Sequence, residues 1–419
     1  MKRANTVIQK FKDAPIQIID GDRGKNYPID SELLDEGYCL FLNTGNVTDA
    51  GFNFNNCQFV SFDKDQILRK GKLKRNDLVM TTRGTVGNVG YYNNKVPFEN
   101  IRINSGMVIF RVDQDEIMPS FLYQYLRSNY FNKQVNALRT GAAQPQLPIR
   151  DIKCIKIQMP QIAEQEKIAD ILSAYDDLID TNRRRIQLLE ESARLLFREW
   201  FVYFRFPLLR QGFGGQAGHE KACPVESRNS TGVKIIDGVP EGWKKEKLIK
   251  IGYLNYGKAL VEETREEGDV KVYGSSGVVG VHSNSLVEGP GIIVGRKGNV
   301  GAIHWVNDNY WPIDTVYYIK KEQSNLFLYL SLKIIGFINT DASVPGLNRD
   351  YAHNKTILVP TKDLLDKFLN QVNDIYSMVK ILTIQNQKLA QARDLLLPRL
   401  MSGEIDPVRY DKLSNGVEV

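Results

Sequence analysis

Residues 168–200, IADILSAYDDLIDTNRRRIQLLEESARLLFREW, carry apolar side chains at alternating steps of four and three. Residues 368–400, FLNQVNDIYSMVKILTIQNQKLAQARDLLLPRL, repeat the pattern 200 positions later. Such spacing is typical of the a and d seam of a coiled coil, here sustained over more than four heptads in each copy. The seam positions are Ile168, Leu172, Tyr175, Ile179, Asn182, Ile186, Leu189, Ala193, Leu196 and Trp200, then Phe368, Val372, Ile375, Val379, Leu382, Asn386, Leu389, Arg393, Leu396 and Leu400. Both stretches follow a proline at the same offset, Pro160 and Pro360, so the sequence predicts a duplicated molecule with two long helices.

Other motifs recur around the two helices. They are GTVGNVG at 84–90 and GRKGNVG at 295–301, QPQL at 144–147 and VPGL at 344–347, and Gly24-Lys25 and Gly257-Lys258. The offset between copies shrinks along the chain, from 233 at Gly-Lys to 200 at the helices, so the first globular head holds about 33 more residues than the second.

The predicted order is head, helix, head, helix. The first head covers 1–160, a central helix 161–205, a Gly-rich flexible linker 206–237, the second head 238–360, a C-terminal helix 361–402 and a tail 403–419. Within the heads, short apolar runs between Gly and Asn turns predict strands at 106–112 and 315–319, each followed by a helix at 120–130 and 326–335. The fold class is therefore α+β, with mixed heads, an antiparallel type of sheet and a pseudo-twofold internal repeat.

The two helices are expected to pair with each other, because each exposes an apolar stripe about 60 Å long at 1.5 Å per residue. A buried Asn in a seam commonly fixes register. Asn182 lies at a d position and Asn386 at an a position, which favours an antiparallel coiled coil with these two residues opposite each other. The alternative is that both asparagines are exposed or satisfied by water. The antiparallel register also sets Leu172 against Leu396, Tyr175 against Arg393, Ile179 against Leu389 and Ile186 against Leu382.

Composition argues against several classes of protein. The 419 residues have a formal charge of +6, which permits a polyanion partner without requiring one. No apolar run approaches the roughly 20 residues needed to span a bilayer, and the N-terminus lacks an apolar signal core, so no membrane association is expected. Four scattered cysteines (Cys39, Cys57, Cys154 and Cys223) have neither metal-ligand nor redox spacing, and indicate reduced thiols in a cytoplasmic protein.

No catalytic, cofactor or metal site is predicted. Residues 252–259, GYLNYGKA, have the spacing of a phosphate-binding loop but lack the Ser or Thr that would hold magnesium. The histidines (His219, His282, His304 and His353) are too far apart to suggest a metal site. The GNVG segments are better interpreted as turns, where Gly and Asn supply positive φ angles.

Over nearly its whole length the chain resembles the specificity subunits of type I restriction–modification systems. The motifs that carry the resemblance are IQMP at 157–160, EQEKI at 164–168, LLE at 188–190, VPEGW at 239–243, VYGSSG at 272–277, IVGRKG at 293–298, WPIDT at 311–315, VPGLNR at 344–349 and RDLLLPRL at 393–400. The Gly-rich insert at 211–218 departs from the pattern. The resemblance implies two target-recognition domains, separated by conserved helices, that read a split double-stranded DNA target with a non-specific spacer.

It also implies a non-catalytic chain with no cofactor of its own. Its helices would hold two modification (methyltransferase) subunits that bring S-adenosylmethionine. Restriction subunits (translocase and nuclease) that use ATP and Mg²⁺ would join them.

Sequence is read at base edges, while phosphate contacts position a protein on DNA, so polar and basic residues on the turns are the DNA-binding candidates. In the first head they are Arg23, Lys25, Asn43, Asn46, Arg83 and Gln146, and in the second Lys258, Ser275, Ser276, Arg296, Lys297, Asn348 and Arg349. The pair Arg296-Lys297, on a Gly-flanked turn, is the best phosphate candidate. For each residue the alternative is a solvated surface or capping role, and Asn348 and Arg349 could equally cap the turn entering the second helix. Two other functions remain open: a coiled-coil scaffold whose heads bind protein, and a reader of single-stranded DNA or RNA that stacks bases on its aromatic residues.

Overall fold

The computed structural model describes residues 7–140, 145–207, 235–236, 238–339 and 346–407. The chain forms two compact units, one of Met1–Thr181 with Gln385–Val419 and the other of Asn182–Ile384. Each unit therefore combines one head with half of each long helix, whereas the sequence-based division treats the helices as separate segments. The predicted linker 206–237 lies outside the described residues, apart from 206–207 and 235–236.

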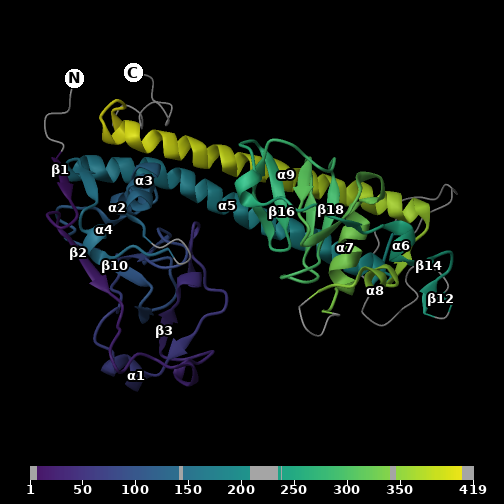
Figure 1. The fold of residues 1–419 in the computed structure, drawn as a ribbon, viewed down its shortest axis with the longest axis horizontal. Helices are drawn as coiled ribbons and strands as arrows, with labels where there is room; N and C mark the ends of the chain where they lie inside the picture. The colour runs from purple at the N-terminus through teal and green to yellow at the C-terminus, as the bar shows by residue number, and fades with distance from the viewer. Residues whose placement is uncertain (1–6, 141–144, 208–234, 237, 340–345, 408–419) are drawn as a thin grey trace, which may run out of the picture. The chain divides into compact units, whose positions relative to one another are not determined.

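The two long helices are α5 (Ile162–Phe201) and α9 (Lys362–Met401), each of 40 residues. Their bounds agree with the predicted helices 161–205 and 361–402 to within one residue, except that α5 ends four residues earlier than predicted; Figure 1 draws both as long helical ribbons. All ten predicted seam residues of each helix are buried or half-buried. Neighbouring apolar residues outside the seam, such as Leu188 and Leu395, are exposed.

The helices run antiparallel, as predicted. In the first unit the N-terminal half of α5 shares a core with the C-terminal end of α9, through Ile168, Leu172, Leu397 and Leu400. In the second unit the C-terminal half of α5 meets the N-terminal half of α9, and the rings of Trp200 and Phe368 lie 5.7 Å apart.

Two layers of strands form the first head. Its main sheet is antiparallel with the order β2 (Ile16–Asp20), β10 (Met107–Val112), β7 (Leu78–Thr81) and β8 (Val89–Tyr91). The second sheet has the order β6 (Phe59–Val60), β3 (Cys39–Leu42) and β9 (Ile101–Ile103). Smaller pairs join β1 (Val7–Lys10) to β11 (Lys156–Met159) and β4 (Val47–Thr48) to β5 (Gly51–Phe52). The helices of this head are α1 (Phe62–Ile67), α2 (Pro119–Leu126), α3 (Asn129–Leu138) and α4 (Ile149–Ile152).

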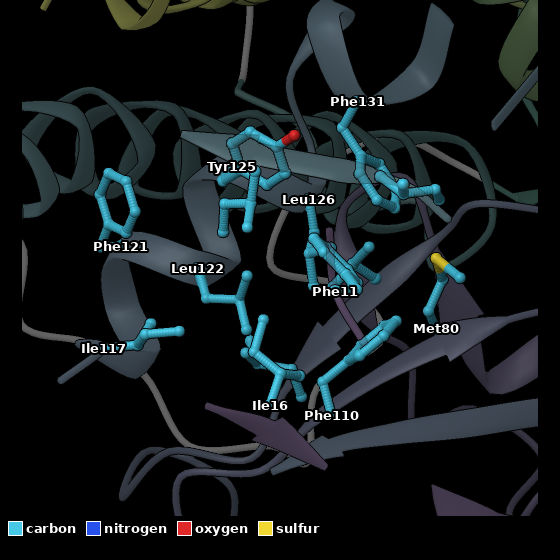
Figure 2. Packing of buried hydrophobic residues seen from close by; sticks show 14 of the residues in the cluster. Phe11, Ile16, Met80, Phe110, Ile117, Phe121, Leu122, Tyr125, Leu126 and Phe131 are labelled. Atoms are coloured by element: carbon cyan, nitrogen blue, oxygen red, sulfur yellow. The ribbon is translucent and has the colours of Figure 1, made fainter. Parts of the chain in front are cut away.

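The apolar run 107–110 lies in the central strand β10, which is covered on both faces. Val108 and Phe110 face the cluster formed with α2, α3 and α5, while Met107 and Ile109 face the cluster of the second sheet. Because both faces of the strand are covered, residues 107–110 are all hydrophobic and do not alternate with polar residues. Figure 2 shows the helix side of this core, where the ring of Phe11 lies 5.7 Å from Phe110, edge to face.

The second head repeats the strand order of the first. Its antiparallel sheet is β15 (Asn255–Tyr256), β21 (Val316–Ile319), β18 (Gly291–Gly295) and β19 (Ile303–Val306), and its second sheet is β17 (Gly277–His282), β16 (Val270–Gly274) and β20 (Tyr310–Pro312). Two pairs join β14 (Lys244–Lys247) to β22 (Thr356–Val359) and β12 (Ile235–Ile236) to β13 (Val239–Pro240). The helices are α6 (Leu248–Ile251), α7 (Leu326–Ile335) and α8 (Arg349–His353). The matching topology confirms the internal repeat.

Three details differ from the sequence-based expectations. The helix predicted at 120–130 is two helices, α2 and α3, because Ser128 accepts a hydrogen bond from Phe131 N and so caps α3. The sheets are not purely antiparallel, since β3 pairs with β9 and β16 with β20 in parallel. The turn at Asn348 enters the short helix α8, not the long C-terminal helix. Among the helices that the structure describes, none combines the length and apolarity of a membrane span.

Candidate nucleic-acid interface

The GTVGNVG turn of the first head connects β7 to β8 and presents Arg83. Gly84 and Gly87 have φ angles of +69° and +99°, which confirms the prediction that glycine supplies left-handed turn positions here. The backbones of Arg83 and Gln146 form an isolated antiparallel β-bridge, and Leu147 N donates to Thr82 O at 3.0 Å. The turn and residues 146–147, far apart in sequence, are thus held side by side.

Three candidates of the first head share one cavity. Arg23, Arg83 and Gln146 line a hollow of about 240 Å³, together with Asp20 and Thr82. The Arg23 guanidinium donates to Asp20 Oδ1 and to Ser105 O, both at 3.2 Å. The cavity therefore offers both donors and a carboxylate acceptor, the two kinds of group that base edges require.

A neighbouring cavity identifies two residues that sequence reasoning missed. Arg69 and Lys70 line a hollow of about 330 Å³ that also includes Asp20 and Arg23. The signal was present in the sequence as the basic run 69–75, RKGKLKR. The exposed Lys25 lies on the loop that follows Arg23.

The buried Asp22 fixes the loop that carries Arg23. Its carboxylate accepts from Gly24 N at 2.8 Å and from Arg69 N at 2.7 Å. Burial alone would raise the pKa of Asp22, but these backbone donors outweigh it and hold that pKa below its ordinary value. The carboxylate is therefore a structural anchor between two basic loops.

Asn43 and Asn46 do not join this group. Asn43 Oδ1 accepts from Gly45 N, while the Asn46 side chain accepts from Asn43 N and donates to Asn53 O. Asn46 is buried. Both amides organise their own loop, which fits the capping alternative, and their contact with DNA stays a prediction.

The second head builds its GRKGNVG turn in the same way. Gly298 and Gly301 have φ angles of +75° and +78°. The backbones of Lys297 and Gly346 form an isolated antiparallel β-bridge, and Leu347 N donates to Arg296 O at 2.9 Å. The turn between β18 and β19 is therefore tied to the segment that enters α8, as the corresponding turn is tied to Gln146 in the first head.

The tie between this turn and the segment that enters α8 also brings together two arginines predicted to bind DNA. The guanidinium carbons of Arg296 and Arg349 lie 5.1 and 4.8 Å from the ring centroid of Tyr256. Arg296 also donates to Asp314 O at 3.0 Å, whereas the buried Nε of Arg349 has no hydrogen-bond partner among the described residues.

The remaining candidates of the second head have different environments. The Lys258 ammonium lies over the Trp311 ring at 6.0 Å. The buried Ser275 hydroxyl accepts from Asn299 N and shapes the turn, while Ser276 is exposed. Asn348 Oδ1 accepts from Tyr351 N and caps α8. Of these four, Lys258 and Ser276 stay open to a ligand.

Among the described residues, the cations of the two turns lack ion-pair partners. In the part of the chain that the structure describes, no carboxylate lies within 4.0 Å of Arg83, Arg296, Lys297 or Arg349. Most other arginines have such a partner. Unpaired cations on paired turns favour an anionic ligand such as a phosphate or the acceptor edge of a base. No group of three or more potential metal ligands occurs in these ranges.

The predicted helix-pairing residues lie on the seam. Leu172, Ile179 and Leu382 are buried, and Ile186, Leu389 and Leu396 are half-buried. Asn386 donates from Nδ2 to Ile179 O at 3.3 Å, and Asn182 is buried. Arg393 donates to Asp176, one residue beyond the Tyr175 predicted opposite it.

Comparison with known proteins finds similar sequences among the specificity subunits of type I restriction enzymes. Residues 17–191 match the sequence model described as the type I restriction modification DNA specificity domain. The chain is 26% identical to the type I restriction enzyme HindI specificity subunit of Haemophilus influenzae, over 87% of this chain and 94% of the relative. It is 24% identical to the MjaIX specificity subunit of Methanocaldococcus jannaschii, over 78% of this chain and 77% of the relative. The crystal structure of the type I restriction–modification S subunit from M. genitalium superposes with a TM-score of 0.49 at 18% identity, covering 95% of this chain and 96% of that one.

Proposed function

We propose that the chain is a specificity subunit of a type I restriction–modification system and that its two heads read the two halves of one split duplex target. It is the DNA-recognition subunit of a restriction–modification complex, and the enzymatic activities belong to the partner subunits. In our proposal the half-sites are separated by a spacer that neither head reads. Because the target is the cell's own or invading DNA, the proposed place of action is the cytoplasm.

The observation that carries the proposal is the repeated pair of turns. In both heads a Gly-flanked turn carries a cation without an ion-pair partner among the described residues, and a backbone β-bridge ties that turn to a second segment. The bridges join Arg83 to Gln146 and Lys297 to Gly346. Arginine and lysine pair with the O6 and N7 acceptors of guanine and glutamine pairs with adenine, and both cations also contact phosphate. The same scaffold with different side chains would give each head its own sequence preference.

The partners follow from the long helices. Outside the seam, α5 exposes Leu178, Leu188 and Leu195, and α9 exposes Met378, Ile381 and Leu395, the last being 71% exposed. We assign these apolar positions to docking of two modification subunits, since a soluble chain rarely leaves such residues uncovered in series. S-adenosylmethionine would then bind to the modification subunits, and ATP with Mg²⁺ to restriction subunits that join the complex.

Mapping methylated adenines across the genome of cells that carry this chain and its partners tests the proposal. The expected result is one bipartite motif with a spacer of fixed length. The paired variants R83A/Q146A and R296A/K297A should each relax the motif on one side only. Absence of a bipartite motif would contradict split-site reading.

Filter binding separates the competing functions. A specificity subunit gives duplex binding that falls steeply with salt. A scaffold gives no DNA binding, and a single-strand or RNA reader is competed more strongly by single-stranded DNA or RNA than by duplex.

A further inference from the structure

The second head contains a cluster of tyrosines and arginines in which one ring lies under two guanidinium groups, an arrangement not found in the described part of the first head. The rings of Tyr256 and Tyr317 lie 5.1 Å apart, and Arg296 lies over both, at 5.1 and 5.9 Å. Arg349 lies over Tyr256 and Tyr253, at 4.8 and 5.8 Å. Tyr256 is the ring that both guanidinium groups share.

The backbone fixes the position of Tyr256. In the short strand β15 it pairs with Tyr317 of β21. The next residue, Gly257, packs so closely that a Cβ there would lie 2.0 Å from Ile313 O. The tyrosine ring nevertheless remains 49% exposed. A ring held by its backbone and open to solvent is suited to orient flexible side chains at a surface.

We propose that Tyr256 is a positioning residue for DNA recognition by the second head, because it holds the Arg296 and Arg349 guanidinium groups ready for one pair of acceptor atoms on the duplex. This inference rests on the proposed function. The ligand it fits is a bidentate acceptor, either the O6 and N7 edge of a guanine or two oxygens of a phosphate.

Three observations support this role. Stacking on an aromatic ring restricts a guanidinium while leaving its N–H groups, which point outward in the ring plane, free to donate. The buried Arg349 Nε has no hydrogen-bond partner among the described residues, and neither arginine has a carboxylate within 4.0 Å there. In the described part of the first head, no aromatic ring lies under Arg23 or Arg83. The effect should therefore be confined to one half-site.

The test uses the full chain assembled with its modification subunits and a duplex that carries the mapped target. Tyr256→Leu should weaken binding roughly tenfold, as expected for the loss of two exposed cation–π contacts. Tyr256→Phe keeps the ring and should bind like the wild type. Arg349→Lys keeps the charge but not the planar fork, and should weaken binding even if Tyr256→Leu proves unstable.

The chain offers a matched control in Tyr203. Its ring lies 5.5 Å from the Arg198 guanidinium and 5.4 Å from that of Arg205, in the same unit, and none of the three residues belongs to the paired turns. Tyr203→Leu removes the same kind of stack and should leave target binding unchanged.

Two modified duplexes distinguish the ligand sources. Replacing guanine by 7-deazaguanine in the half-site of the second head removes N7, so wild-type binding falls and Tyr256→Leu becomes insensitive to the change if a base is read. A methylphosphonate in the same half-site produces that pattern instead if a phosphate is held. The same modifications in the other half-site should act equally on the wild type and on Tyr256→Leu.

The possible failures are distinguishable. If the wild-type complex shows no preference for its mapped target, the proposed function fails. If the wild type binds its target but Tyr256→Leu and Arg349→Lys bind equally well, or Tyr256→Phe is as weak as Tyr256→Leu, the positioning role is refuted and the proposed function stands.

Discussion

Asp176 of α5 connects three helices of the first unit, and its replacement by asparagine tests what holds that unit together. Its carboxylate accepts from Arg393 of α9, from Gln124 of α2 at 2.6 Å and from Arg127, which ends α2, at 2.9 Å. Burial alone would raise the pKa of Asp176, but Arg127, Gln124 and Arg393 together lower it below its ordinary value. The change to asparagine keeps the shape, leaves the half-buried Arg127 guanidinium without its anion and leaves Arg393 with Asp394 alone.

The expected loss is about 3 kcal/mol. Removing one partner of a buried ion pair costs roughly 3–5 kcal/mol. The side chains of Asp176 and Arg393 remain 19% and 13% exposed, so partial solvation favours the lower end of that range. About 3 kcal/mol corresponds to a roughly 150-fold change in the unfolding equilibrium.

The assay is urea unfolding followed by two probes. All four tryptophans (Trp200, Trp243, Trp305 and Trp311) lie in the second unit, so tryptophan fluorescence reports that unit alone, whereas far-ultraviolet circular dichroism reports both. Asp176→Asn should shift the dichroism component that belongs to the first unit and leave the fluorescence transition in place.

A neighbouring residue provides the control, and pH provides a second check. Asp177 pairs with Lys95 at an exposed position, so Asp177→Asn should change stability by less than about 0.5 kcal/mol. Because the pKa of Asp176 is lowered in the folded state, its contribution is present above the unfolded pKa near 4 and is lost as pH falls through the folded value. The difference between wild type and Asp176→Asn should therefore shrink in acid. A loss under 1 kcal/mol at pH 7, or a shift of the fluorescence transition, would refute the reasoning.

Three further predictions concern single residues. Gly257→Ala places a Cβ 2.0 Å from Ile313 O, a steric clash, and should destabilise the second unit by about 1–3 kcal/mol in a fluorescence-detected urea titration. Burial raises the pKa of the Cys39 thiol to about 12, so at pH 8 iodoacetamide should modify the exposed Cys154 at least a hundredfold faster, as read by mass spectrometry. Arg83→Ala should weaken target binding and, if the residue contacts a phosphate, lower the slope of log affinity against log salt by about 1 in filter binding; an unchanged affinity would exclude contact.

The long helices could be predicted from sequence because their signal is local and repeated. Ten apolar or seam positions recur at fixed steps, and Pro160 and Pro360 mark where each helix can begin. The turns at Gly84 and Gly298 were equally accessible, since a positive φ angle restricts the choice of residue. In both cases a physical requirement is written into a few adjacent residues.

The arginine cluster of the second head could not be predicted in the same way. Tyr256 lies in a strand of two residues, too short for any periodic pattern, and its partner Tyr317 is about 60 residues away. Arg296 and Arg349 were named separately as DNA-binding candidates, but only tertiary structure places one ring beneath both. The break between α2 and α3 is a different case, because Ser128 is a recognisable capping residue within an otherwise helical stretch.

The division of each long helix between the two units has a practical consequence for building hybrid proteins. A graft that exchanged the first head at Pro160 would separate its core residues, such as Phe121, from Leu172 of α5 and Leu400 of α9, with which they share one hydrophobic core. Crossover points at 181/182 and 384/385 would instead transfer each hydrophobic core whole. Chimeras designed with these junctions should fold with the stability of their parents, and new pairs of half-site preferences could then be assembled from existing heads.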